Sequence, residues 1–96
     1  MSPLKIKKLS KIRSELDKLD NYLIKIIKKR TNLVKKVLEL KDKKNQIIDK
    51  KRINIILKNI KRKSIKNHID PKITNRIWKN MIWAYIDFEK RNFKKK

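Results

Sequence analysis

The sequence predicts an all-α fold of three helices, one very long first helix followed by two shorter ones. Glycine is absent and proline occurs only twice in 96 residues, so residues that break helices are rare. Between residues 9 and 41, apolar side chains recur at alternating steps of three and four, the spacing of one helix face. No segment shows the strict alternation of a half-buried strand. A chain of this length is expected to form a single domain, residues 1–96, with a disordered tail at about residues 94–96.

The first helix is expected to begin with Ser2 as its cap and Pro3 in its first position. It is expected to run to Lys41, which gives a length of roughly 57 Å at 1.5 Å per residue. Its apolar face, called the seam below, is formed by Leu9, Ile12, Leu16, Leu19, Leu23, Ile26, Arg30, Leu33, Val37 and Leu40. Long, thin helices with such a face usually complete their core with another chain, so we expect an oligomer.

The remaining helices are marked by a second apolar pattern and by a capping motif. Residues 42–46 are polar and without period, which predicts a loop. The second helix is expected to start near Ile48 or Asp49 and to fade through the polar run 61–68. Asp70 and Pro71 form the clearest start signal in the chain, an N-cap followed by proline at the first helical position. The third helix carries the apolar residues Ile73, Ile77, Trp78, Met81, Ile82, Tyr85, Ile86, Phe88 and Phe93.

Composition limits the class of function. The formal net charge of +22 is typical of nucleic-acid-binding proteins, but the lysines are spread along the whole chain and accompany an over-use of Ile and Asn. A nucleic acid is therefore not the expected partner, although the positive field would speed the arrival of a small polyanion. The chain has no cysteine, no apolar run of membrane-spanning length and no signal-peptide pattern, so a cytoplasmic protein without a membrane segment is expected. No cluster of His, Cys and carboxylates suggests a metal, and none is expected.

Arg30 is the exception in the seam. A guanidinium is rarely placed on an apolar stripe without an anion to bind. Lys41 is 11 residues further on, about 1100° of helix rotation and 16 Å along the axis, so both side chains face the same way. Arg13 lies 17 residues before Arg30, about 25 Å away and rotated by about 100°. If Arg13 does not simply pair with Asp17, it must serve a site centred on another protomer's Arg30, as antiparallel pairing of the long helices would allow.

Two further pairs share helix faces. Asp49 and Arg52 are i, i+3 neighbours at the start of the second helix, and Tyr85 and Glu89 are i, i+4 neighbours on the third. Each pair also has a purely structural interpretation. Asp49 and Arg52 would then form a surface ion pair worth under about 1 kcal/mol, Tyr85 would belong to the core, and Glu89 would only contact its helical neighbours.

Five short motifs together resemble a known family. They are I-R-x-E-L-D-x-L-D at 12–20, K-R-x-x-L-V at 29–34, L-K at 40–41, D-x-x-R at 49–52 and D-P at 70–71. Their order and spacing resemble the AroQ-type (all-α, type II) chorismate mutases, from Leu9 to about Phe93. The resemblance implies an intertwined, domain-swapped-like homodimer whose long first helices span both subunits. It also implies rearrangement of chorismate to prephenate in phenylalanine and tyrosine biosynthesis, with no nucleophile, cofactor or metal.

The resemblance also implies roles for individual residues. Arg30 and Arg13 of the partner subunit would bind the two carboxylates of the substrate, and Arg52 would help to orient it. Lys41 would donate a hydrogen bond to the ether oxygen. Asp49 would meet the ring hydroxyl.

Three positions depart from the family pattern. Ile53 stands where many members have glutamate, Tyr85 where serine is common, and Glu89 where many bacterial members have glutamine. The first two, with Trp83-Ala84-Tyr85-Ile86, are similar to the sister isochorismate-pyruvate lyases of salicylate synthesis, so lyase activity is the alternative function. Glu89 would be the second donor to the ether oxygen, and a carboxyl group donates only when it is protonated.

Overall fold

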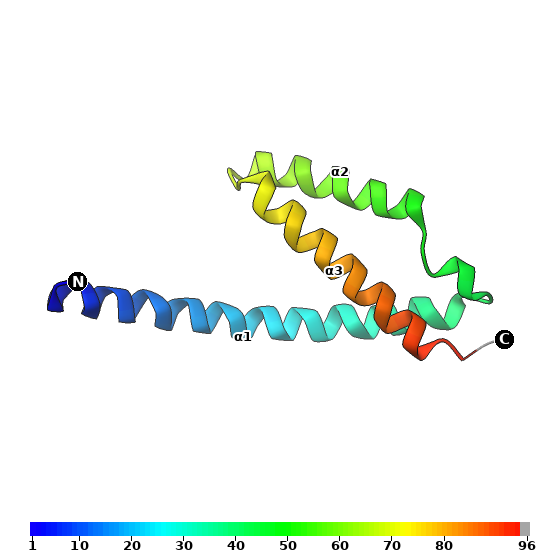
Figure 1. Cartoon of the computed structure of the whole chain (residues 1–96), viewed down its shortest axis with the longest axis horizontal. Coiled ribbons are helices and arrows are strands. Elements are labelled where there is room, and N and C mark those ends of the chain that lie inside the picture. Colours follow the sequence, from blue (N-terminus) through cyan, green and yellow to red (C-terminus); the bar gives the residue numbers. More distant parts are fainter. Residues whose placement is uncertain (95–96) are drawn as a thin grey trace. The chain divides into compact units, whose positions relative to one another are not determined.

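The computed structural model describes residues 1–94 and confirms the all-helical prediction. The elements are α1 (Pro3–Leu40), the 3₁₀ turn η1 (Lys44–Gln46), α2 (Lys50–Lys66) and α3 (Pro71–Asn92) (Figure 1). No strand occurs among these residues. The chain has two compact parts, Met1–Leu33 and Val34–Lys96, which are described separately below. Of the tail that was expected to be disordered, residues 95–96 lie outside the described part of the chain.

Both ends of α1 fall where local chemistry places them. The Lys5 backbone N–H donates to Ser2 Oγ at 3.3 Å, and Pro3 occupies the first helical position, as predicted. The helix ends at Leu40, one residue before the expected Lys41, whose N–H bonds the Leu38 carbonyl at 3.1 Å. The prediction of a buried seam is not met within one chain, because no residue of α1 is buried.

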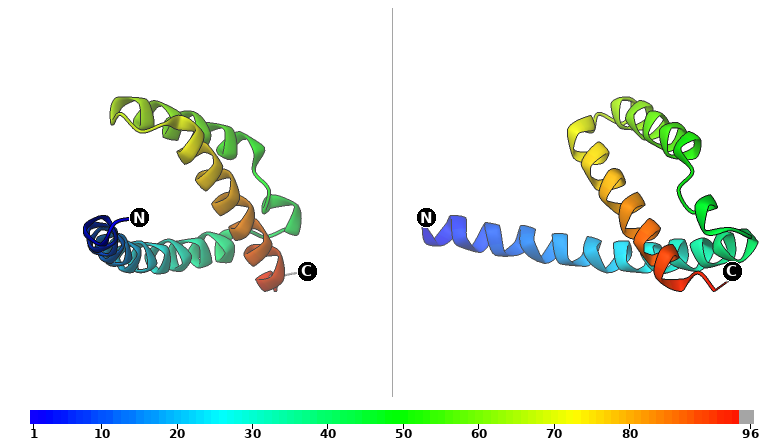
Figure 2. Two further views of the ribbon diagram at one scale, coloured as in Figure 1. Left: turned by 60° about the vertical axis from the view of Figure 1, so that its left-hand side comes forward. Right: turned by 45° about the vertical axis from the view of Figure 1, so that its right-hand side comes forward.

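Helices α2 and α3 pack as an antiparallel hairpin within the second part of the chain (Figures 1 and 2). They lie closest at the turn that joins them and diverge toward the other end, as all views agree. Ser64, on α2, is only 3% exposed. Its hydroxyl bonds the Ile60 carbonyl and the Thr74 hydroxyl of α3, each at 2.6 Å. The end of α2 therefore lies within the run 61–68 through which the helix was expected to fade. The polar run contains an inward-facing serine, and the helix continues to Lys66.

The turn between α2 and α3 is stabilised by backbone capping. Asn67 closes α2, His68 adopts a left-handed conformation with φ of 58°, and the Ile69 N–H bonds the Ser64 carbonyl at 2.9 Å. The Asp70 carboxylate then accepts from the Lys72 N–H at 2.9 Å and Pro71 opens α3, as predicted. The turn thus fixes how α3 leaves α2.

The hydrophobic core of one chain is small. Within residues 1–94 the buried hydrophobic side chains are those of Ile47 and Ile86. Ile47 belongs to the connection between α1 and α2, and Ile86 to α3. Most of the chain's large apolar residues remain accessible to solvent.

Candidate functional site

An ion pair between Lys41 and Glu89 is the centre of the candidate site. Lys41 Nζ lies 3.0 Å from Glu89 Oε1. Lys41 directly follows α1, whereas Glu89 lies near the end of α3, where it is only 6% exposed. The two residues expected to act on the same substrate atom are thus brought together from positions 48 residues apart.

The connection after Lys41 supplies a second partner for the ammonium group. Lys41 Nζ donates to the Ile47 carbonyl at 3.4 Å, and the Ile47 side chain is 3% exposed. The Gln46 side-chain oxygen accepts from the backbone N–H groups of Asp42 and Lys43 at 2.8 and 2.9 Å. Sequence reasoning treated this segment only as a loop and missed both residues. The available signal was a glutamine three residues after the start of the turn, the spacing at which a side chain reaches back to a cap.

Asp49 and Arg52 meet through the backbone. Asp49 is the N-cap of α2, and its Oδ1 accepts from the Arg52 backbone N–H at 3.0 Å. The surface ion pair considered from the sequence is not formed between these two described residues. Asp49 lines an open hollow of about 740 Å³ together with Lys41, Gln46 and three neighbours, Leu40, Ile48 and Lys50. One face of this connection therefore carries both a cation and a carboxylate.

Tyr85 lies one helical turn before Glu89 on α3. It is partly buried, whereas Glu89 is buried. The i, i+4 spacing predicted for this pair is therefore realised on a regular helix.

Arg13 and Arg30 both belong to the part Met1–Leu33, and both are exposed. Neither forms an ion pair within residues 1–94, so the expected alternative of an Arg13–Asp17 pair is absent there. The seam around Arg30 is exposed as well, with Ile26 at 51% and Leu33 at 59%. Within residues 1–94 neither arginine is paired with an acidic side chain.

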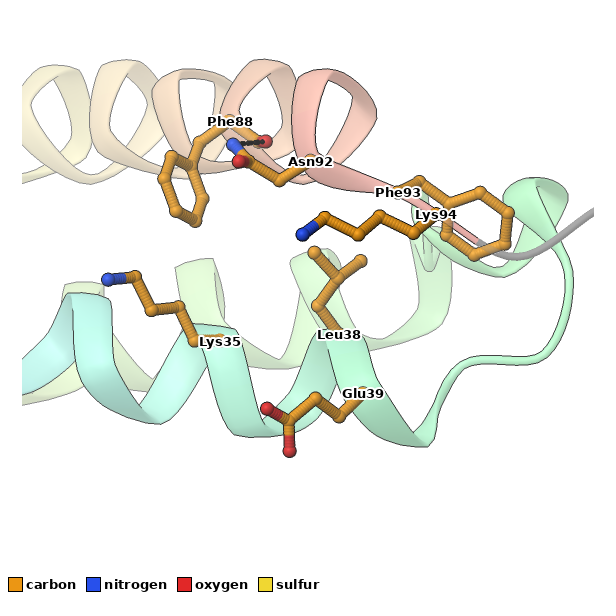
Figure 3. A pocket seen from close by; sticks show the side chains of 7 residues that line it. All are labelled: Lys35, Leu38, Glu39, Phe88, Asn92, Phe93 and Lys94. Atoms are coloured by element: carbon orange, nitrogen blue, oxygen red, sulfur yellow. Dashed lines mark hydrogen bonds between the residues drawn. The ribbon is translucent and has the colours of Figure 1, made fainter.

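A second hollow, of about 330 Å³, lies between the last turns of α1 and the end of α3 (Figure 3). Phe88 and Leu38 point toward each other across it, and the Asn92 side chain bonds the Phe88 carbonyl at 2.8 Å. None of the predicted site residues lines it. We place the candidate site at Lys41 and Glu89, where ionisable groups meet, and not in this mainly apolar hollow.

Neither a metal cluster nor a membrane segment is found in the described chain. Residues 1–94 contain no group of three or more His, Cys, Asp and Glu side chains arranged to hold a metal ion. No helix among them combines the length and apolar character needed to cross a bilayer.

The fold and the site define a small all-α protein that places a lysine, a glutamate and an aspartate at the junction of its helices. The sequence model of the family described as chorismate mutase type II matches residues 12–90. A relative, the chorismate mutase of Methanocaldococcus jannaschii, is 32% identical over 78 residues, which cover 80% of this chain and 79% of the relative. No solved structure matches the chain. The chain belongs to the type II chorismate mutase family and is thus an isomerase of this type.

Proposed function

We propose that the protein rearranges chorismate to prephenate in active sites shared between two protomers, as a cytoplasmic step toward phenylalanine and tyrosine. The observation that carries this proposal is the Lys41–Glu89 pair, in a chain whose family match contains every predicted site residue. The printed name of the relative supports the same reaction.

The exposed seam supports a homodimer. Side chains such as Leu16, Leu19 and Leu23 are each more than half exposed in one chain. Burying a leucine side chain stabilises a protein by about 1.5–3 kcal/mol, so a helix with this row of side chains favours association. The seam residues follow one another at alternating steps of three and four residues without interruption, and the partner best suited to such a pattern is a second copy of the same helix.

The arginines of the long helix are the proposed carboxylate ligands. Chorismate is a dianion, and a guanidinium fork binds a carboxylate through two parallel hydrogen bonds. We assign one carboxylate to Arg30 and the other to Arg13 of the partner subunit. Arg52 orients the substrate from the first turn of α2. Within residues 1–94 all three arginines are exposed and form no ion pair, which supports their assignment as anion ligands.

Lys41 is the proposed donor to the ether oxygen. In the rearrangement one C–O bond breaks and one C–C bond forms within the same molecule, so no proton, electron or co-reactant has to enter. Negative charge develops on the ether oxygen, and a positioned cation stabilises it. A lysine ammonium has three N–H donors. Two of them already point to Glu89 Oε1 and to the Ile47 carbonyl, which leaves the third for the substrate.

Glu89, Tyr85 and Asp49 complete the proposed site. The Oε1 atom of Glu89 accepts from Lys41, so the other carboxyl oxygen, when protonated, is the second donor to the ether oxygen. Tyr85 lines the site one turn earlier. Asp49 has one oxygen engaged in capping α2 and a second with which to accept from the ring hydroxyl.

A direct assay tests the function. Chorismate and isochorismate are incubated separately with the protein, and prephenate, salicylate and pyruvate are measured. We expect prephenate from chorismate. Salicylate and pyruvate from isochorismate, without prephenate formation, would instead identify a lyase.

The Arg30→Ala variant should lose at least about 100-fold in kcat/KM, because a desolvated carboxylate of the substrate loses its charged ligand. Its salt-dependent binding to DNA should hardly change, since it removes one of 31 basic residues.

A further inference from the structure

We propose that Gln46 and Ile47 are positioning residues for Lys41, so that the connection between α1 and α2 sets the direction of the ammonium group. This inference rests on the proposed function, because it concerns the donor to the ether oxygen. Neither residue is assigned any contact with the substrate.

Ile47 provides a fixed acceptor. Its side chain is 3% exposed, which makes it one of the two buried hydrophobic residues in the described chain. Burial anchors the backbone at this point, and with it the carbonyl that accepts from Lys41 Nζ at 3.4 Å. Together with Glu89 Oε1 at 3.0 Å, this carbonyl restrains a side chain that otherwise has four rotatable bonds. With two of its donors held, the ammonium has a defined direction for the third.

Gln46 closes the segment that carries this carbonyl. The peptide N–H groups of Asp42 and Lys43 follow the end of α1 and both donate to Gln46 Oε1. The Gln46 backbone N–H bonds the Lys43 carbonyl at 3.0 Å, and the Ile47 N–H bonds that of Lys44 at 3.2 Å. One exposed side chain thus folds residues 42–47 into a compact turn that returns to Lys41.

The same turn leads directly into a second proposed site residue, Asp49. Asp49 follows Ile47 by two positions, and Gln46, Lys41 and Asp49 line one hollow. Without the two bonds to Gln46 Oε1, the segment gains conformational freedom and Lys41 loses its second acceptor for part of the time. Lys41 acts on charge that develops only in the transition state, so the loss should appear mainly in kcat and much less in KM.

Three variants test the proposal. Gln46→Leu keeps the size of the side chain and removes the acceptor, Gln46→Glu keeps the acceptor, and Asn45→Leu is the matched control. The Asn45 side chain is exposed in the same turn and makes no hydrogen bond within residues 1–94. We expect Gln46→Leu to lower kcat by roughly 10- to 100-fold with KM within about twofold, since small misplacements of a catalytic group have effects of this size. Gln46→Glu should recover kcat to within about threefold, and Asn45→Leu should match the wild type.

A readout independent of activity locates the effect. In Gln46→Leu, amide hydrogen exchange at Asp42 and Lys43, followed by NMR, should be faster than in the wild type and in Asn45→Leu. A wild-type protein that does not convert chorismate would refute the proposed function. The hydrogen-exchange result would then still show whether Gln46 stabilises the turn. A Gln46→Leu enzyme with wild-type kcat, or with a loss that Asn45→Leu shares or Gln46→Glu does not recover, would overturn the positioning role.

Discussion

At the scale of single residues, the proposed site requires Glu89 both to accept and to donate a hydrogen bond, which a glutamate can do only when it is protonated. Its Oε1 accepts from Lys41, for which either form of the carboxyl group is suitable. Donation to the ether oxygen requires a proton on the other oxygen. A glutamine at this position would meet both demands at every pH, because its amide carries one acceptor oxygen and one donor nitrogen.

This difference predicts the pH dependence of the reaction. Wild-type kcat/KM should fall as the pH rises, because a carboxylate without its proton cannot donate a hydrogen bond to the ether oxygen. The Glu89→Gln variant should show a flatter profile and should exceed the wild type at alkaline pH. Initial rates of prephenate formation between pH 5 and 9 (the range of an ordinary buffer series) measure both profiles. If the glutamine variant keeps the wild-type slope, Glu89 is not the donor.

At the scale of elements, the positions of the helix ends were predicted where the signal is local. Ser2 with Pro3 and Asp70 with Pro71 cap their own helices, so the sequence alone places both starts. Near the end of α2, Ser64 instead bonds Thr74 of another helix, and no pattern within α2 predicts that contact. The two hydrogen bonds that the Asp42 and Lys43 N–H groups donate to Gln46 Oε1 were also not predicted, because a loop has no periodic pattern from which partners can be inferred. The pair Lys41 and Glu89 was predicted to act together only through the family resemblance.

The turn between α2 and α3 contains a strained residue that can be tested. His68 has a φ of 58°, in the left-handed region that is unfavourable for residues with a Cβ atom. Glycine at this position after a helix end is free of that strain, although it also gains entropy in the unfolded chain. We expect His68→Gly to raise the free energy of unfolding by about 0.5–1 kcal/mol. Urea denaturation at a fixed protein concentration measures it.

A matched change separates strain from any role of the imidazole ring. His68→Ala removes the ring and keeps the Cβ atom, so it should leave the stability close to that of the wild type. If alanine stabilises as much as glycine does, the backbone conformation is not the cause. The turn lies at the opposite end of α2 from Asp49, so kcat should be unchanged in both variants.

At the scale of the whole molecule, a single chain buries little apolar surface within residues 1–94. Two buried hydrophobic residues among the described 94 are far too few for a stable core, and the exposed seam of α1 holds the missing apolar area. Assembly and catalysis are therefore coupled in the proposed dimer, because the helix that supplies the interface also carries Arg13 and Arg30. A substitution that weakens the seam should lower activity at low protein concentration, because the proposed dimer then dissociates. This loss requires no change in any site residue.

Complementation between two inactive variants tests whether each site is shared. In a dimer with antiparallel long helices, Arg30 of one protomer and Arg13 of the other serve the same substrate. The Arg13→Ala and Arg30→Ala homodimers should both be nearly inactive, since every site lacks one carboxylate ligand. A heterodimer of the two has one site with both arginines intact and one with neither, so it should show about half of the wild-type activity per dimer. Co-expression with two different affinity tags isolates the heterodimer for this assay. If the two arginines acted within the same chain, both sites of the heterodimer would lack an arginine and no activity would return.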